Sequence, residues 1–170
     1  MKLYHGSNVV VQTPDPFSGR KKLDFGPGFY TTTLAEQAEQ WALRTALQRD
    51  NNKATATVSV YEFQYENQLI LKSFNGYDEE WLLFVCNNRR SDKASIDHGF
   101  DIIFGHIADD RVIETVDYFI EQLMAGRASQ ALVTLTIEQL ALQQPNDQFC
   151  FASSRLNEVL TFDHTYKVQS

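Results

Sequence analysis

The chain has 170 residues, of which 43% are apolar and 22% charged, a composition typical of an ordinary globular protein long enough to bury a core. The net charge of −7 argues against nucleic-acid binding through an overall basic surface and leaves only a local basic patch around Arg89-Arg90. Two cysteines are too few for a disulfide framework and favour a reducing compartment.

The N-terminal residues do not form the apolar core of a signal peptide. The longest hydrophobic run, Trp81–Cys86, is far too short to span a membrane. No repeat or low-complexity linker divides the chain. We therefore expect a single cytoplasmic domain over residues 1–170 that does not associate with membranes.

The first half of the chain is predicted to alternate strands with helices. The helix after the second strand follows a capping-box pattern, Thr33-Leu34-Ala35-Glu36. The elements expected in chain order are a strand at 3–7, a surface excursion over 8–23, a strand at 29–32, a helix over about 34–49, a strand at 55–65 and a helix at 78–88.

The second half continues this mixture without a regular strand–helix–strand period. A second capping-box pattern, Thr136-Ile137-Glu138-Gln139, predicts a short helix that begins there and ends before Pro145. The other expected elements are a strand at 101–107, a helix over about 111–125 that stops at Gly126, a strand at 148–151, a helical turn capped by Ser153 and a strand at 161–168. The fold class predicted is α+β.

His5 stands in the middle of the first predicted strand and is followed by Gly6. The ordinary interpretation is a hydrogen-bonded structural histidine. The functional interpretation is a donor to a ligand hydroxyl, with the glycine allowing the backbone to approach closely. The other histidines and the cysteines do not stand at metal-ligand spacing, so no metal site is expected.

The segment Gly26-Pro27-Gly28-Phe29-Tyr30 leads a glycine-rich loop into the second predicted strand. It is either a plain turn before an edge strand or an element that presents Tyr30 to a planar ligand ring. Such stacking contributes roughly 0.5–1.5 kcal/mol beyond the area buried. The spacing does not match the glycine patterns that cradle phosphate groups.

Gln148 opens a late aromatic strand in which Cys150 lies between Phe149 and Phe151. The glutamine either bonds the preceding turn or faces a ligand. The cysteine has no base nearby in the sequence, so we expect a buried, inert thiol.

In order and spacing, these segments resemble the His–Tyr–Glu arrangement of the ADP-ribosyltransferase superfamily, and the whole chain resembles one small bacterial branch of it. The resemblance implies a split β-sandwich of two small sheets with flanking helices, which binds NAD as co-substrate. The resembling segments are 3–7, 24–32, 78–89, 101–110 and 147–151.

Carried over from the superfamily, His5 would bond the adenine-side ribose and the Gly6 backbone would bond the nicotinamide amide. Tyr30 would stack on the nicotinamide ring. The loop from Asp24 would lie over the cofactor. The resemblance further implies cofactor contacts by Gly28, Phe29 and Thr31, and contact with the NAD phosphates by Arg89, for which a solvent-exposed arginine is the alternative.

At the third position the superfamily usually has Glu, and this chain has Gln148. The lost charge is worth roughly 4 kcal/mol at 4 Å in an effective dielectric of about 20, or about a thousandfold in rate. Asp109 and Asp110 are candidates for a compensating carboxylate, or they form a solvated helix start. On this view Gln148→Glu would raise NAD hydrolysis.

The leading hypothesis is a mono-ADP-ribosyltransferase that cleaves NAD and passes ADP-ribose to a macromolecular acceptor. By analogy it would be a toxin or phage-defence effector with a partner antitoxin protein. The alternative is a catalytically inactive NAD- or nucleotide-binding module. RNA 2′-phosphotransfer is a third candidate, disfavoured by the acidic charge.

Overall fold

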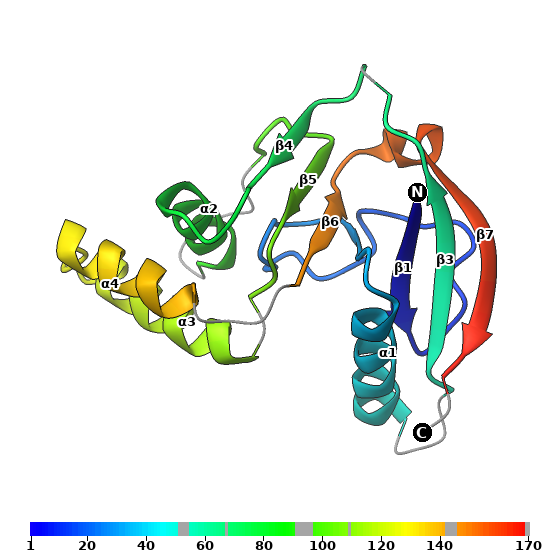
Figure 1. Cartoon of the computed structure of the whole chain (residues 1–170), viewed down its shortest axis with the longest axis horizontal. Helices are drawn as coiled ribbons and strands as arrows, with labels where there is room; N and C mark the ends of the chain where they lie inside the picture. Colours follow the sequence, from blue (N-terminus) through cyan, green and yellow to red (C-terminus); the bar gives the residue numbers. More distant parts are fainter. Residues whose placement is uncertain (51–54, 67, 91–96, 109, 142–145, 169–170) are drawn as a thin grey trace.

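Two small β-sheets form the framework of the molecule, the four-stranded one in the middle and the three-stranded one at one side (Figure 1). The structure is a computed structural model that describes residues 1–50, 55–66, 68–90, 97–108, 110–141 and 146–168. One sheet has the order β1-β3-β7 and is wholly antiparallel. Its strands are β1 (Lys2–Ser7), β3 (Thr57–Phe63) and β7 (Leu160–Lys167).

The second sheet has the order β2-β6-β5-β4 and is antiparallel except for the pair β4 and β5. Its edge strands are short, and the central pair β6 and β5 is buried. Its strands are β2 (Phe29–Thr31), β6 (Gln148–Phe151), β5 (Ile102–Gly105) and β4 (Leu71–Ser73).

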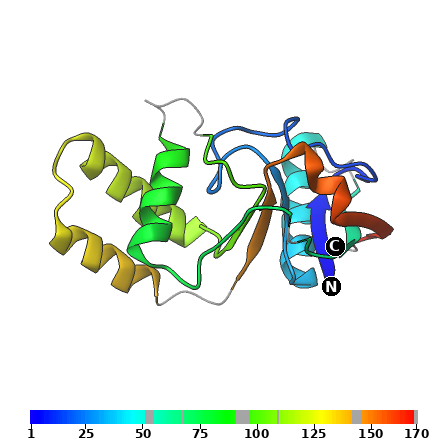
Figure 2. The same ribbon diagram turned by 90° about the horizontal axis from the view of Figure 1, so that it is seen from above.

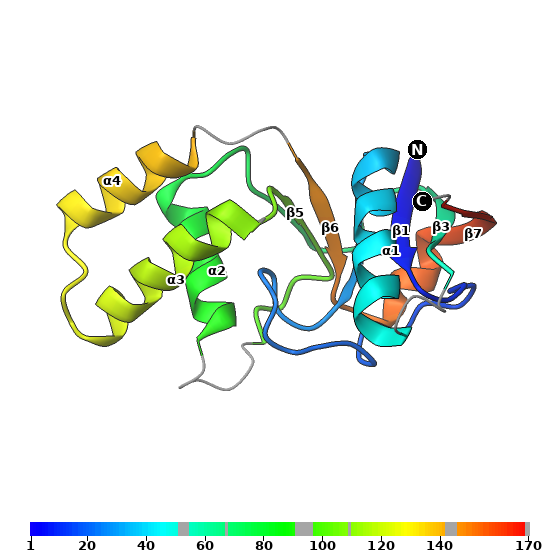
Figure 3. The ribbon, with the colours of Figure 1, turned by 90° about the horizontal axis from the view of Figure 1, so that it is seen from below.

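Helices cover the sheets on different sides. Helix α1 packs along β1, whereas α2, α3 and α4 gather beyond the four-stranded sheet (Figures 1 and 3). None of the described helices is long and apolar enough to cross a membrane. The bounds are α1 (Ala35–Asp50), α2 (Glu79–Arg89), α3 (Asp110–Met124), α4 (Gln130–Leu140) and the 3-10 turn η1 (Ser154–Glu158).

Strand β6 is buried on both faces because it separates two apolar clusters. Phe149 and Phe151 pack with residues of the three-stranded sheet such as Leu3 and Tyr61. Cys150, between them, packs on the opposite face with residues of α2 and α3. Figure 2 shows β6 in orange between the helices and the three-stranded sheet. This placement turns the side chains at 148 and 150 to the helix-covered face.

The predicted α+β class, with two small sheets and flanking helices, is confirmed. Apart from α4, which begins six residues before its predicted start, the predicted strands and helices appear with boundaries within about two residues. Strand β4 was not predicted, because it has only three residues and is recognisable only by its pairing with β5.

Both predicted capping boxes are wrong. The Thr33 hydroxyl donates to the Asp147 carboxylate instead of capping α1. Helix α4 begins six residues before Thr136, with the Ser129 hydroxyl as its cap, and the Thr136 hydroxyl donates to the carbonyl of Leu132 inside the helix. The capping-box residue types are therefore present at both places, but the threonine hydroxyl groups form hydrogen bonds other than the capping bond.

Candidate functional site

The two sheets meet at a single backbone bridge between β1 and β2. The Tyr4 N–H donates to the Thr32 carbonyl at 2.8 Å, and the Thr32 N–H donates back to the Tyr4 carbonyl at 3.0 Å. Since β2 also pairs with β6, strands β1, β2 and β6 are hydrogen-bonded in succession. His5, Tyr30 and Gln148 therefore lie on three neighbouring strands.

The His5 imidazole interrupts the ladder between β1 and β2. Its Nδ1 lies 2.7 Å from the Tyr30 carbonyl oxygen, and its ring centroid lies 4.5 Å from that of Phe29. A carbonyl only accepts, so Nδ1 carries the proton. Burial lowers the pKa of His5, and the hydrogen bond to Tyr30 offsets this only in part. The ring is thus neutral near pH 7, with Nε2 as an acceptor, whereas the sequence predicted a donor.

The bridge between β1 and β2 does not continue to Gly6. In an antiparallel ladder the N–H and C=O of alternate residues face the same edge, so Gly6 faces β2, as Tyr4 does. The Tyr30 carbonyl that would pair with Gly6 accepts from His5 instead. Gly6 itself is buried, so this edge of its backbone lies inside the molecule.

The absence of a side chain at Gly6 is explained by helix packing. A Cβ there would stand 1.9 Å from the Ala38 carbonyl oxygen of α1. The glycine therefore allows α1 to approach β1. The close approach predicted from the sequence is real, but its partner is this helix.

The Tyr30 side chain is fixed by the loop that precedes β2. Its hydroxyl donates to the Gly26 carbonyl at 2.7 Å and accepts from the Phe25 N–H at 3.1 Å. Burial raises the pKa of Tyr30 well above its usual value, so the hydroxyl stays protonated. No ring contact joins Tyr30 to another aromatic residue in the described part of the chain, and its half-buried side chain packs against the apolar cluster that includes Cys150.

Gly28 is constrained by the strand beneath it. A Cβ there would lie 2.3 Å from the Cys150 sulfur and 3.0 Å from the Phe151 carbonyl oxygen. Gly26, by contrast, has a φ of 81°, which side-chain-bearing residues rarely adopt. Both glycines shape the loop that holds the Tyr30 hydroxyl.

Gln148 is buried, with 6% of its surface exposed, and its amide touches a carboxylate that the sequence reasoning did not single out. Its Nε2 donates to Asp24 Oδ2 at 3.1 Å and lies 3.3 Å from the His106 carbonyl oxygen. The only advance signal for Asp24 was its place at the start of the glycine-rich loop, 124 residues from Gln148.

Arg89 reaches the same cluster but binds protein there. Its Nη1 lies 2.5 Å from Asp24 Oδ1, and its Nε lies 3.9 Å from Asp117. The neighbouring Asn88 donates to the Asp24 carbonyl at 3.3 Å, so the C-terminal turn of α2 holds this loop. The observed contacts of Arg89 are therefore those of a residue that orients Asp24.

The remaining predicted site residues lie elsewhere. Phe29 and Thr31 are buried in β2, and the Thr31 hydroxyl has no partner among the described residues. Asp109 lies outside the described residues. Asp110 is the first residue of α3, and its side chain lies outside what the structure describes. The described contacts thus form two groups: His5 bonds the Tyr30 backbone, and Gln148 and Arg89 meet at Asp24.

Cys150 lies behind this site as an unreactive thiol. It is fully buried beneath Gly28, and burial raises its pKa to about 12. Across the described ranges, no group of three or more His, Cys, Asp or Glu residues is placed to hold a metal ion. The available chemistry is therefore hydrogen bonding, stacking and a buried carboxylate.

Comparison with known proteins gives one match. A family model described as "Protein of unknown function (DUF3990)" matches residues 1–162, which include every site residue named above. No curated protein and no solved structure matched the chain.

Proposed function

The chain belongs to that family, and we propose that it is an NAD-dependent mono-ADP-ribosyltransferase. The observation that carries the proposal is the succession of His5, Tyr30 and Gln148 on strands that are hydrogen-bonded one to the next, with Gly6 beside His5. These are the residues on which the sequence resemblance rests.

The site offers groups that suit both the nicotinamide and the ribose of NAD. The N–H and C=O of Gly6 are complementary to a carboxamide, which has both an acceptor and a donor. Tyr30 offers a ring whose tilt is fixed through its hydroxyl. The Nε2 of His5 would accept a hydrogen bond from a ribose hydroxyl.

In the proposed reaction the bond between ribose C1′ and the nicotinamide nitrogen breaks. Its electron pair leaves with nicotinamide, which becomes neutral, and the positive charge moves to the ribose as an oxocarbenium ion. An acceptor nucleophile then bonds to C1′ and loses its proton to solvent. Gln148 would stabilise the cation through its amide oxygen, held on the ribose 2′-hydroxyl.

A specific observation favours the second candidate, an NAD-binding module without turnover. Gln148 is neutral, and the carboxylate that contacts it, Asp24, is already paired with Arg89. A site of this kind can hold NAD while offering little charge to the transition state.

Nicotinamide release from NAD, together with NAD binding by calorimetry, separates these candidates. We expect release by the native chain and its loss in His5→Ala. The matched control is His164→Ala, which removes an exposed histidine of β7. Binding without release would favour the inactive module, and the absence of binding would reject both. Transfer is scored by mass spectrometry as ADP-ribose added to a candidate acceptor.

A further inference from the structure

Asp24 is the centre of a buried hydrogen-bond cluster. Only 7% of its surface is exposed. Oδ1 accepts from Arg89 Nη1 at 2.5 Å, and Oδ2 accepts from the Ala108 N–H at 2.9 Å and from Gln148 Nε2 at 3.1 Å. Each described partner of this carboxylate is a hydrogen-bond donor, and one of them is the charged guanidinium of Arg89. The cluster joins the loop before β2, the end of α2, the segment after β5 and the start of β6.

The contacts of Gln148 fix which way its amide points. Nε2 faces two acceptors, the Asp24 carboxylate and the His106 carbonyl. A rotated amide would place Oε1 against both of these oxygens, so the rotated state is repulsive. The amide oxygen is thereby directed away from Asp24.

A hydrogen bond from Nε2 to a carboxylate also changes the amide itself. Hydrogen bonds in a chain polarise one another, and a buried site weakens solvent screening. The negative charge of Asp24 therefore increases the negative character of Gln148 Oε1. Arg89, on the far oxygen of the carboxylate, holds Asp24 in place.

We propose that Asp24 is the positioning residue for Gln148: it orients the amide and supplies through it the negative character that a neutral glutamine lacks. This rests on the proposed NAD cleavage. No proton passes between Asp24 and Gln148. When the C1′–nitrogen bond breaks, Oε1 of Gln148 accepts from the ribose 2′-hydroxyl more strongly than an isolated amide would.

A purely structural role for Asp24 makes a different prediction. The same carboxylate ties its loop to α2, and that loop holds the Tyr30 hydroxyl. If this were its whole role, the loss of Asp24 would disturb NAD binding and stability together, and no change at position 148 would compensate.

The test moves the negative charge from position 24 to position 148. In Asp24→Asn we expect kcat for nicotinamide release to fall about tenfold to a hundredfold with KM changed less than about twofold. In the double variant Asp24→Asn/Gln148→Glu the carboxylate bonds the ribose directly, and we expect kcat at least about tenfold above that of Asp24→Asn. A double variant no faster than Asp24→Asn would overturn the proposal.

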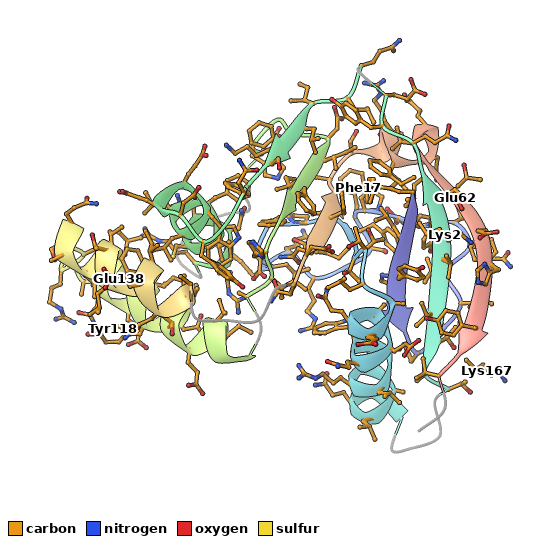
Figure 4. The ribbon with its side chains drawn as sticks, in the orientation of Figure 1. Lys2, Phe17, Glu62, Tyr118, Glu138 and Lys167 are labelled. Carbon is orange, nitrogen blue, oxygen red and sulfur yellow. The ribbon has the colours of Figure 1, made fainter. Side chains whose placement is uncertain are left out.

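The matched control removes a different aspartate from an ion pair. Asp163 binds Lys2 at 2.9 Å on the three-stranded sheet, where Figure 4 labels Lys2. Asp163→Asn should leave kcat and KM unchanged. If it lowers kcat as much as Asp24→Asn does, the effect belongs to general charge removal and the proposal fails.

Side-chain amide NMR tests the interaction without any activity. The Gln148 NH₂ signals, identified by their loss in Gln148→Met, should lie downfield in the native chain and move upfield in Asp24→Asn. Unmoved signals would overturn the positioning role. A native chain that shows the shifted signals but releases no nicotinamide would refute the proposed function while leaving the Asp24–Gln148 contact established. If Asp24→Asn does not fold, the native chain decides: Gln148 NH₂ signals without the downfield shift would overturn the proposal.

Discussion

Gln148→Glu should not restore activity, because it places a second carboxyl group against Asp24. The two residues are 6% and 7% exposed, and the amide nitrogen that the substitution replaces lies 3.1 Å from Asp24 Oδ2. The sequence alone predicted that this variant would raise hydrolysis, since it restores the glutamate of the superfamily. The observed contact reverses that expectation.

The repulsion between the two carboxylates in Gln148→Glu can be estimated from this contact. Two carboxylate charges about 4 Å apart at an effective dielectric of about 20 repel by roughly 4 kcal/mol. At about 1.4 kcal/mol per pKa unit, the pKa of the introduced carboxyl would rise by about three units, from about 4.3 to about 7. This rise in pKa is an upper limit, because the positive charge of Arg89 on the other oxygen of Asp24 offsets part of the repulsion.

The stability of Gln148→Glu should therefore decrease as the pH rises. The introduced carboxyl binds its proton more tightly in the folded than in the unfolded chain, so the free energy of unfolding falls as pH rises from about 4.3 to about 7. At pH 5 the protonated group can donate to Asp24, and Gln148→Glu should be nearly as stable as the native chain. At pH 8 it should have lost up to about 4 kcal/mol.

Urea denaturation at pH 5, 6, 7 and 8 measures this difference. Gln12→Glu, at an exposed position, is the matched control and should show no such trend. The double variant Asp24→Asn/Gln148→Glu should also lack it, because only one carboxylate remains. Equal stability of Gln148→Glu and the native chain at pH 8, or an equal loss at pH 5 and pH 8, would refute the reasoning.

Three further predictions concern the elements around the site. Gly6→Ala should lower the free energy of unfolding by at least about 2 kcal/mol, because the added Cβ would meet the Ala38 carbonyl oxygen at 1.9 Å. The control Gly76→Ala, whose Cβ would have nothing within 4 Å, should change it by less than about 0.5 kcal/mol. Cys150, with its pKa raised to about 12, should resist thiol reagents at pH 8 until the chain is unfolded; rapid labelling of the folded chain would contradict its burial. Because burial lowers the pKa of His5, stability should fall as pH drops below about 6.5, and His5→Gln should show a smaller fall by urea denaturation.

Local sequence patterns predicted most of the elements because those elements follow their own periodicity. The apolar stripe of α3, with Val112, Val116 and Phe119 buried, is visible in the sequence alone. The alternation in β6 likewise predicted a buried Cys150. The first capping box failed because its side-chain partner is not local: the Thr33 hydroxyl donates to Asp147, 114 residues away. The second failed because α4 already runs through Thr136, whose hydroxyl donates to the Leu132 carbonyl.

The site could be predicted only as far as its residue types. Sequence order suggested that His5, Tyr30 and Gln148 belong together, and the strand succession places them on neighbouring strands. Which groups they bond could not be predicted. The contacts of Asp24 with Arg89 and Gln148 span 65 and 124 residues, and they depend on how the loop before β2 meets α2 and β6.

A crystal structure of the native chain soaked with NAD tests the central claim most directly. The account predicts the nicotinamide carboxamide on the N–H and C=O of Gly6, its ring on Tyr30, and a ribose hydroxyl on His5 Nε2. It also predicts Gln148 Oε1 on the nicotinamide ribose, with Nε2 still bonded to Asp24. NAD bound away from the bridge between β1 and β2 would contradict the account, as would a Gln148 amide whose oxygen faces Asp24.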